Sequence, residues 1–179
     1  MEPVLEQLRY PIGKFKGQES YTAEDLSAWI STIEALPLWF DHIIENLDAH
    51  QLDTPYRPGG WTMSQTIHHV ADSHMNGFIR LKLALTEDKP VIKPYLEALW
   101  ATTPEIQDIP VNVSITLLHS LHRRWASLLR NMKEDDWRRS YFHPEHQKEI
   151  PLWESTAMYA WHCRHHMEHL RALKDRMGW

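Results

Sequence analysis

Residues 87–111 constrain the fold of this chain more than any other segment. They contain Pro90, Pro94, Pro104 and Pro110, show no clear hydrophobic periodicity, and separate two amphipathic segments. A helix of about 22 residues is about 33 Å long, and a connection of this size can return along such a helix. The two helices that it joins can therefore be parallel. An up-down-up-down bundle would not need such a connection.

Four segments have the apolar spacing of amphipathic helices. The first follows Thr22, a plausible N-cap before Glu24 and Asp25, and carries a proline, Pro37, that should kink or split the helix. The second opens with the capping box Thr62-Met63-Ser64-Gln65 and continues to about Thr86. These two segments supply the first half of the predicted bundle.

The other two helices lie beyond residue 111. The third carries Leu117, Leu121 and Trp125 and should be capped by Asn112 or Ser114. The fourth starts near Pro151, a favourable first helical residue, and stops at Gly178. Residues 138–150 could hold a small hairpin. We predict an all-α protein, a four-helix bundle of up-down-down-up connectivity with one long crossover, forming a single domain over residues 1–179.

Composition excludes several classes of protein. The net charge of −5 argues against binding nucleic acid, which needs a basic face. We find no apolar run of about 18 residues for a membrane span and no secretory signal at the start. The one cysteine, Cys163, rules out an internal disulfide and fits a reducing compartment. We therefore expect a cytoplasmic protein.

Histidine is the compositional outlier, with 13 residues, and His162, His165, His166 and His169 lie within one segment of the fourth helix. On a helical wheel, His166 lies within about 40° of the centre of the inward stripe and His162 lies at its edge. His165 and His169 also form an i, i+4 pair, but they lie toward the polar side. Imidazole suits zinc, nickel, copper and iron, and an i, i+4 pair can grip one ion. We favour this interpretation over that of hydrogen-bonded core histidines.

The residues themselves leave the third ligand open. In the second helix, His69 lies on the polar side with Thr66, Ser73, Asn76 and Arg80, and the wheel slightly prefers His74 as the residue that faces the core. His119 and His122 in the third helix, and His143 and His146 in a loop, compete less well. Cys163 is interpreted as a small core residue rather than a ligand.

Several segments together resemble a known family, the YfiT branch of the DinB-like superfamily. They are Tyr10-Pro11-Ile12-Gly13, residues 52–62 with Arg57-Pro58-Gly59-Gly60-Trp61, residues 68–76, and Tyr159-Ala160-Trp161-His162. The likeness extends over nearly the whole chain. Members of this family look like up-down-down-up bundles that bind a divalent ion through three histidines. By the family pattern, the resemblance implies His69, His162 and His166 as the metal ligands.

The resemblance also implies a function. The family is described as metal-dependent hydrolases, in which the ion would activate water. The alternatives are a metal-dependent thiol S-transferase that conjugates bacillithiol-type thiols to electrophiles, and a metal-binding protein without catalysis. The expected cofactor is one divalent ion per chain, zinc or nickel. The expected partners are a small-molecule substrate and a second copy of the chain, because relatives look dimeric.

No residue can be assigned as the general acid or base from the sequence. Asp72, Glu168 and Tyr159 lie within one helical turn of the implied ligands and could orient them. The simpler interpretation, which we favour, is two surface carboxylates and a core tyrosine. The polar side of the second helix could instead bind an anionic thiol cofactor.

Overall fold

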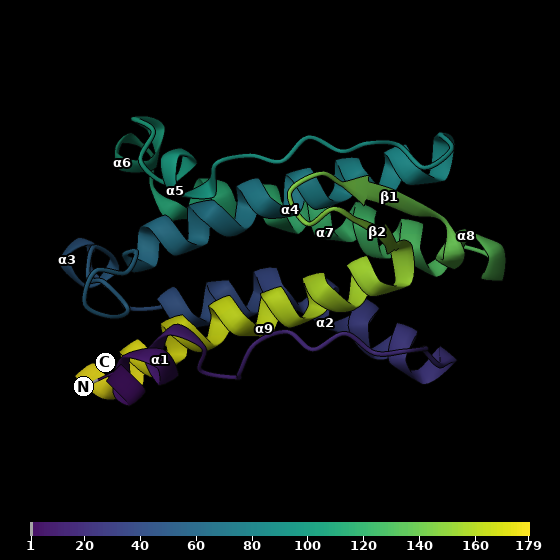
Figure 1. Ribbon diagram of the computed structural model, residues 1–179. Helices are drawn as coiled ribbons and strands as arrows, with labels where there is room; N and C mark the ends of the chain where they lie inside the picture. Colours follow the sequence, from purple (N-terminus) through teal and green to yellow (C-terminus); the bar gives the residue numbers. More distant parts are fainter. Residues whose placement is uncertain (1) are drawn as a thin grey trace.

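Four long helices form the body of the computed structural model, which describes residues 2–179. They are α2 (Ala23–Ile44), α4 (Met63–Thr86), α7 (Val111–Arg130) and α9 (Leu152–Met177). In Figure 1, α4 and α7 run in one direction and α2 and α9 run in the other. The predicted up-down-down-up bundle is therefore confirmed, and residues 87–110 form the long crossover along α4.

The helix ends follow the local sequence in α2, α4 and α9. Thr22 and Asp25 form a capping box at the start of α2, and Thr62 and Gln65 form another at the start of α4. Pro151 lies one residue before the first helical residue of α9, and Gly178 ends that helix with a positive φ of 72°. The predicted cap of α7 is wrong, because Pro110 occupies that position and neither Asn112 nor Ser114 does.

Pro37 does not split its helix. The helix α2 continues through it to Ile44, and Pro37 itself is buried. Because proline has no backbone N–H, the carbonyl of Ile33, one turn earlier, loses its usual partner within the helix. That carbonyl instead accepts a short hydrogen bond from the His122 side chain of α7. A side chain from a neighbouring helix thus replaces the missing bond.

Short elements connect the long helices. Two single-turn helices, α5 (Glu97–Trp100) and α6 (Glu105–Asp108), interrupt the crossover, and α3 (Ala49–Leu52) precedes α4. The predicted hairpin is present after α8 (Glu134–Arg138) as antiparallel β1 (Ser140–His143) and β2 (Lys148–Pro151). At the amino end, α1 (Glu2–Arg9) and the chain that follows it lie along α9 (Figure 1).

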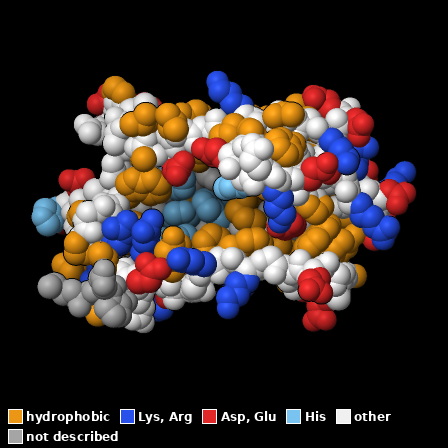
Figure 2. All heavy atoms as spheres, viewed as in Figure 1, with side chains coloured by type: hydrophobic (Ala, Val, Ile, Leu, Met, Phe, Trp, Pro, Cys, Tyr) orange, Lys and Arg blue, Asp and Glu red, His pale blue; other side chains and the backbone are white. Residues whose placement is uncertain are grey.

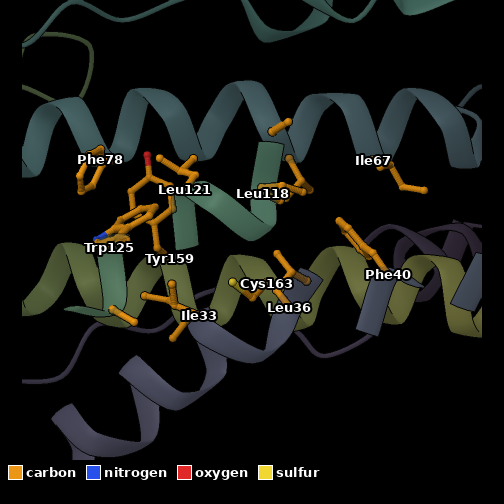
Figure 3. Close-up of a cluster of buried hydrophobic side chains, with 14 of the residues drawn as sticks. Ile33, Leu36, Phe40, Ile67, Phe78, Leu118, Leu121, Trp125, Tyr159 and Cys163 are labelled. Carbon is orange, nitrogen blue, oxygen red and sulfur yellow. The ribbon is translucent and has the colours of Figure 1, made fainter. Parts of the chain in front are cut away.

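The core lies between the four long helices. Figure 3 shows Trp125 beside Tyr159, with Ile33, Leu36 and Phe40 of α2 and Leu118 and Leu121 of α7 in the same cluster. A Cβ atom on Gly77 of α4 would overlap the ring of Tyr159, so only glycine allows this close approach. None of the helices in the described part of the chain is both long enough and apolar enough to cross a membrane.

Candidate metal centre

Two helices bring His69, His162 and His166 together. His69 comes from α4, and the other two come from adjacent turns of α9. Each offers one ring nitrogen, and these three atoms lie within 4.8 Å of one another. The Nε2 atoms of His162 and His166 are 3.1 Å apart. The ring centroid of His69 lies 5.6 Å from that of His162 and 5.0 Å from that of His166.

Burial keeps these three imidazoles neutral. It lowers the pKa of His69 to about 4. Burial also holds the pKa of His162 and of His166 well below the ordinary value, and repulsion from neighbouring histidines lowers both further. At neutral pH each ring therefore has one nitrogen with a lone pair, the form that binds a metal ion.

The donor set fits a divalent ion. Two nitrogens bound to one tetrahedral ion lie about 3.4 Å apart, close to the spacing between His162 and His166. The Nδ1 atom of His166 is buried and has no hydrogen-bond partner among the described residues, so the protein leaves a polar atom of this cluster unsatisfied. Three neutral imidazoles without a thiolate or a carboxylate match zinc, nickel and their neighbours.

A second histidine group lies next to the first, and it corrects the wheel. His165 and His169 were expected toward the polar side of α9, yet both are buried. With His166 they also place three ring nitrogens within 4.8 Å of one another. The ring of His165 stacks on Trp161 at 4.4 Å, and that of His169 stacks on Tyr56 at 4.0 Å. The wheel failed because it treated α9 as covered on one side only.

The remaining histidines are distributed through the structure. His74 is fully buried, as the wheel preferred, and its Nε2 atom lies 3.0 Å from Nδ1 of His162. His68 is buried and bonds to Ser114 at 2.7 Å. His119 is exposed and pairs with Asp41 on α2. In the hairpin, His143 is buried and stacks on His146.

A cavity of about 420 Å³ opens onto both histidine groups. In Figure 2, histidine side chains are visible at the bottom of a hollow on the displayed face, with cationic and anionic groups near its rim. The walls include Tyr10, Tyr56, Trp61 and Tyr95, and the charged lining residues are Arg9, Arg57 and Glu97. The ring of Trp61, two residues before α4, lies 4.4 Å from that of His69.

Sequence reasoning did not assign roles to most of these lining residues. Tyr10, Tyr56, Arg57, Gly59 and Gly60 all lie in the segments that carry the family resemblance, which was the available signal. Arg9 adjoins one such segment. Glu97 and Tyr95 come from the crossover, where the absence of periodicity gave no information about which side chains face the site.

The three residues suggested as ligand orienters do not line this cavity. Tyr159 is a core residue whose hydroxyl group donates to the carbonyl of Ser73 at 3.3 Å, and Glu168 pairs with Arg171. Asp72 is half-buried, and burial raises its pKa to about 6. Cys163 is fully buried and free, so its interpretation as a core residue is confirmed.

The polar residues proposed to bind an anionic thiol are engaged elsewhere. Thr66 and Asn76 bond to backbone carbonyls one turn earlier in α4, at 2.8 and 2.9 Å. Arg80 is buried and donates to the carbonyl of Lys93 in the crossover. Neither these residues nor Ser73 line the cavity beside the histidines, so a thiol bound in this cavity would not contact them.

The fold and the matched sequence define a class of protein. The DinB superfamily profile matches residues 33–170, and the chain belongs to this superfamily. The structure of YfiT from Bacillus subtilis is similar to this one, with a TM-score of 0.94 and 42% identity over 97% of this chain and 99% of that chain. YfiT is described as "a probable metal-dependent hydrolase with an unusual four-helix bundle topology".

Two curated relatives are equally close in length. A protein of Bacillus cereus (strain 03BB102) and one of Bacillus thuringiensis subsp. konkukian are each 48% identical over 98% of this chain and 100% of their own length. Both carry the name "Putative metal-dependent hydrolase".

Proposed function

We propose that the protein is a metal-dependent hydrolase whose divalent ion is held by His69, His162 and His166. The observation that carries this proposal is the convergence of three neutral imidazoles, of which His69 and His166 are buried and His162 is half-buried, at an open cavity of about 420 Å³. A zinc or nickel ion bound there would act as a Lewis acid that lowers the pKa of water and polarises a carbonyl or phosphoryl group. The names of the relatives support the same reaction class.

Aromatic side chains shape the site around the ligands. Trp61 lies against His69 and limits the rotation of that ring. Tyr56 and Tyr10 cover His169 and His165 on the opposite side, with ring centroids 4.0 and 5.9 Å away. These ring contacts hold the histidine side chains in place around the cavity.

Glu97 is the one carboxylate among the cavity-lining residues of the described chain. Its place on α5 puts it on a different element from the three proposed ligands. We assign it the role of holding a proton during hydrolysis, since a general base must come from a group that faces the substrate. Replacement Glu97→Gln should lower the hydrolytic rate by about 100-fold with metal content unchanged, and an unchanged rate would contradict the assignment.

A thiol S-transferase is the second candidate, and two arginines are compatible with it. Arg9 and Arg57 line the cavity beside the histidines, where they can attract the carboxylate of an anionic thiol. Burial lowers the pKa of His169, and the positive charge of Arg57 lowers it further. The charge of Arg57 therefore acts on a side chain that lines the cavity. The same pair would also attract an anionic ester or phosphoester, so charge alone does not separate the candidates.

One experiment separates hydrolysis from S-transfer. The metal-loaded protein is assayed against esters, amides and phosphoesters, in parallel with conjugation of a small thiol to an electrophilic aromatic compound. Hydrolysis without added thiol supports the first proposal. Thiol-dependent turnover without hydrolysis supports the second, and the Co²⁺ form should then show a sulfur-to-metal charge-transfer band on addition of thiol. If the site is fully occupied and neither activity is found, the result would support a metal-binding protein without catalysis.

We also propose that the protein forms a homodimer. Large apolar side chains are exposed on the crossover and on α7, including Leu96 at 63%, Leu99 at 61% and Val113 at 48%. Burial of such side chains against a second copy would remove apolar surface from water. Light scattering at micromolar concentration should give twice the mass of 21.3 kDa, and a single 21.3 kDa species would contradict this proposal.

A further inference from the structure

A line of hydrogen bonds runs from the proposed metal ligand His162 into the core. Nδ1 of His162 lies 3.0 Å from Nε2 of His74 in α4. Nδ1 of His74 lies 2.8 Å from Nε2 of His122 in α7. Nδ1 of His122 makes a short hydrogen bond with the carbonyl oxygen of Ile33 in α2. His74 and His122 are both buried, so water does not compete for these bonds.

Pro37 leaves the Ile33 carbonyl, at the far end of this line, free to accept a hydrogen bond from a side chain. In an α-helix, the carbonyl of residue 33 accepts from the N–H of residue 37, and here residue 37 has no N–H. The Ile33 carbonyl therefore needs a donor in the interior of the bundle. His122 supplies that donor from α7.

The Ile33 carbonyl determines which ring nitrogen of each histidine in the line carries the proton. A carbonyl oxygen only accepts, so Nδ1 of His122 carries a proton. His122 is neutral because burial lowers its pKa to about 4, and its Nε2 must therefore accept from Nδ1 of His74. By the same rule, Nε2 of neutral His74 accepts from Nδ1 of His162. His162 is left with an unprotonated Nε2, which faces His166.

We propose that His122 and His74 are positioning residues that fix His162 in the tautomer with a free Nε2 lone pair, and that the carbonyl released by Pro37 anchors them. This inference rests on the proposed metal site, because its benefit is a ligand that is ready to bind. A ligand histidine whose other nitrogen donates a hydrogen bond is oriented and made more basic. The line cannot carry protons away from the site, since a backbone carbonyl cannot take one up.

His166 lacks such an arrangement. Its Nδ1 atom is buried and has no partner among the described residues, and its Nε2 atom faces the lone pair of His162. In the metal-free protein, Nε2 of His166 must therefore carry the proton that bonds to His162. Binding of an ion through Nε2 of both rings then requires His166 to move its proton to Nδ1. His162 thus already has the tautomer that binds an ion, whereas His166 must change its tautomer.

The first test reads the tautomers directly. In ¹⁵N-histidine-labelled, metal-free protein, long-range proton–nitrogen NMR should show His122, His74 and His162 protonated at Nδ1 and His166 protonated at Nε2. Addition of zinc should move the proton of His166 and leave those of the other three in place. A His162 ring protonated at Nε2 in the metal-free protein would overturn the proposal.

The second test uses variants and zinc affinity. His74→Leu removes the acceptor for His162 and should weaken zinc binding by about 10- to 100-fold, with one ion still bound at saturation. His74→Gln keeps a donor and an acceptor at similar positions and should restore affinity to within about threefold of the wild type. In the same samples, the His162 tautomer should be lost in His74→Leu and retained in His74→Gln.

His68→Leu is the matched control. His68 is also buried in α4 and also makes one hydrogen bond, to Ser114, but it does not bond to the line that leads to His162. Thermal unfolding without metal should show a loss of stability in both leucine variants, whereas only His74→Leu should lose zinc affinity. Equal zinc affinity in His74→Leu and the wild type would overturn the proposal. A wild-type protein that binds no ion would instead contradict the proposed function, while the NMR result would still decide the tautomers.

Discussion

Two histidine pairs on α9 have the same spacing and different surroundings. His162 and His166 are four residues apart, as are His165 and His169, and all four lie on one helix. His162 bonds to His74, and both members of its pair face His69 of α4. His165 and His169 lie against Trp161 and Tyr56, and Nε2 of His169 donates to the carbonyl of Arg9.

The comparison explains why only one of two pairs with the same i, i+4 spacing enters the proposed ligand set. What differs is the partner across the helix. The first pair meets a third imidazole from another long helix, which completes the set of three that we propose as ligands. The second pair meets aromatic rings and a backbone carbonyl, which hold histidines as wall residues. We therefore expect the first pair to govern metal content and the second to govern the stability of the cavity wall.

The largest expected effect is the loss of metal from the first pair. His166→Ala removes one of three ligands and should abolish most of the bound ion, whereas His165→Ala should retain it. Elemental analysis of the two purified variants, prepared side by side, measures the effect. Full occupancy in His166→Ala, or loss in His165→Ala, would reverse the assignment of the two pairs.

The second expected effect concerns the cavity wall. His169→Leu removes the hydrogen bond to the Arg9 carbonyl and the stacking on Tyr56, and should lower the free energy of unfolding by about 1–2 kcal/mol. Zinc stoichiometry should remain one per chain. Urea unfolding in the presence of a chelator gives the first value, and a variant as stable as the wild type would show that the wall does not depend on His169.

Replacement of Asp72 should have a smaller effect, which measures the free-energy cost of burying a charge on α4. Burial raises its pKa to about 6, so the unfolded state ionises first as the pH rises from about 4, and the native state pays for the buried charge above pH 6. Asp72→Asn should thus raise stability at pH 7.5 by about 1 kcal/mol, allowing for its exposed half, and leave stability at about pH 3, below the unfolded pKa, unchanged. Thermal unfolding at both pH values tests this, and equal shifts would contradict it.

The smallest expected effect concerns Pro37, which leaves the Ile33 carbonyl free for His122. Pro37→Ala provides an N–H that competes with His122 for the Ile33 carbonyl. A carbonyl can accept two hydrogen bonds, so zinc affinity should fall by only about two- to fivefold. The variant also removes a proline from the interior of a helix, which should raise thermal stability. Zinc affinity should therefore fall while thermal stability rises. Isothermal titration calorimetry and unfolding on one preparation measure both, and unchanged affinity would separate Pro37 from the site.

Local sequence predicted the parts of the fold that depend on local interactions. The capping boxes at Thr22 and Thr62 and the glycine at 178 marked helix ends, and the proline-rich segment indicated a crossover. The cap of α7 could not be predicted in this way, because Pro110 has no side-chain hydrogen bond to offer and two polar residues follow it.

The site was harder to predict, because its surroundings come from distant segments. A helical wheel measures one face, and it placed His165 and His169 outside because it could not include Tyr10, Tyr56 and the carbonyl of Arg9. His69 was selected by the family resemblance rather than by periodicity. Pro37 was predicted to kink or split its helix, and the helix continues through it, with a donor from α7 on the Ile33 carbonyl.

The line from Ile33 to His162 takes one member from each of the four long helices, in the order α2, α7, α4 and α9. A folding intermediate in which any one helix is undocked breaks this line. Such an intermediate would hold zinc less tightly than the native state, even if His69, His162 and His166 had already met. Tight metal binding then selects the completely assembled bundle, so that the rate at which zinc affinity develops during refolding reports the docking of the last helix.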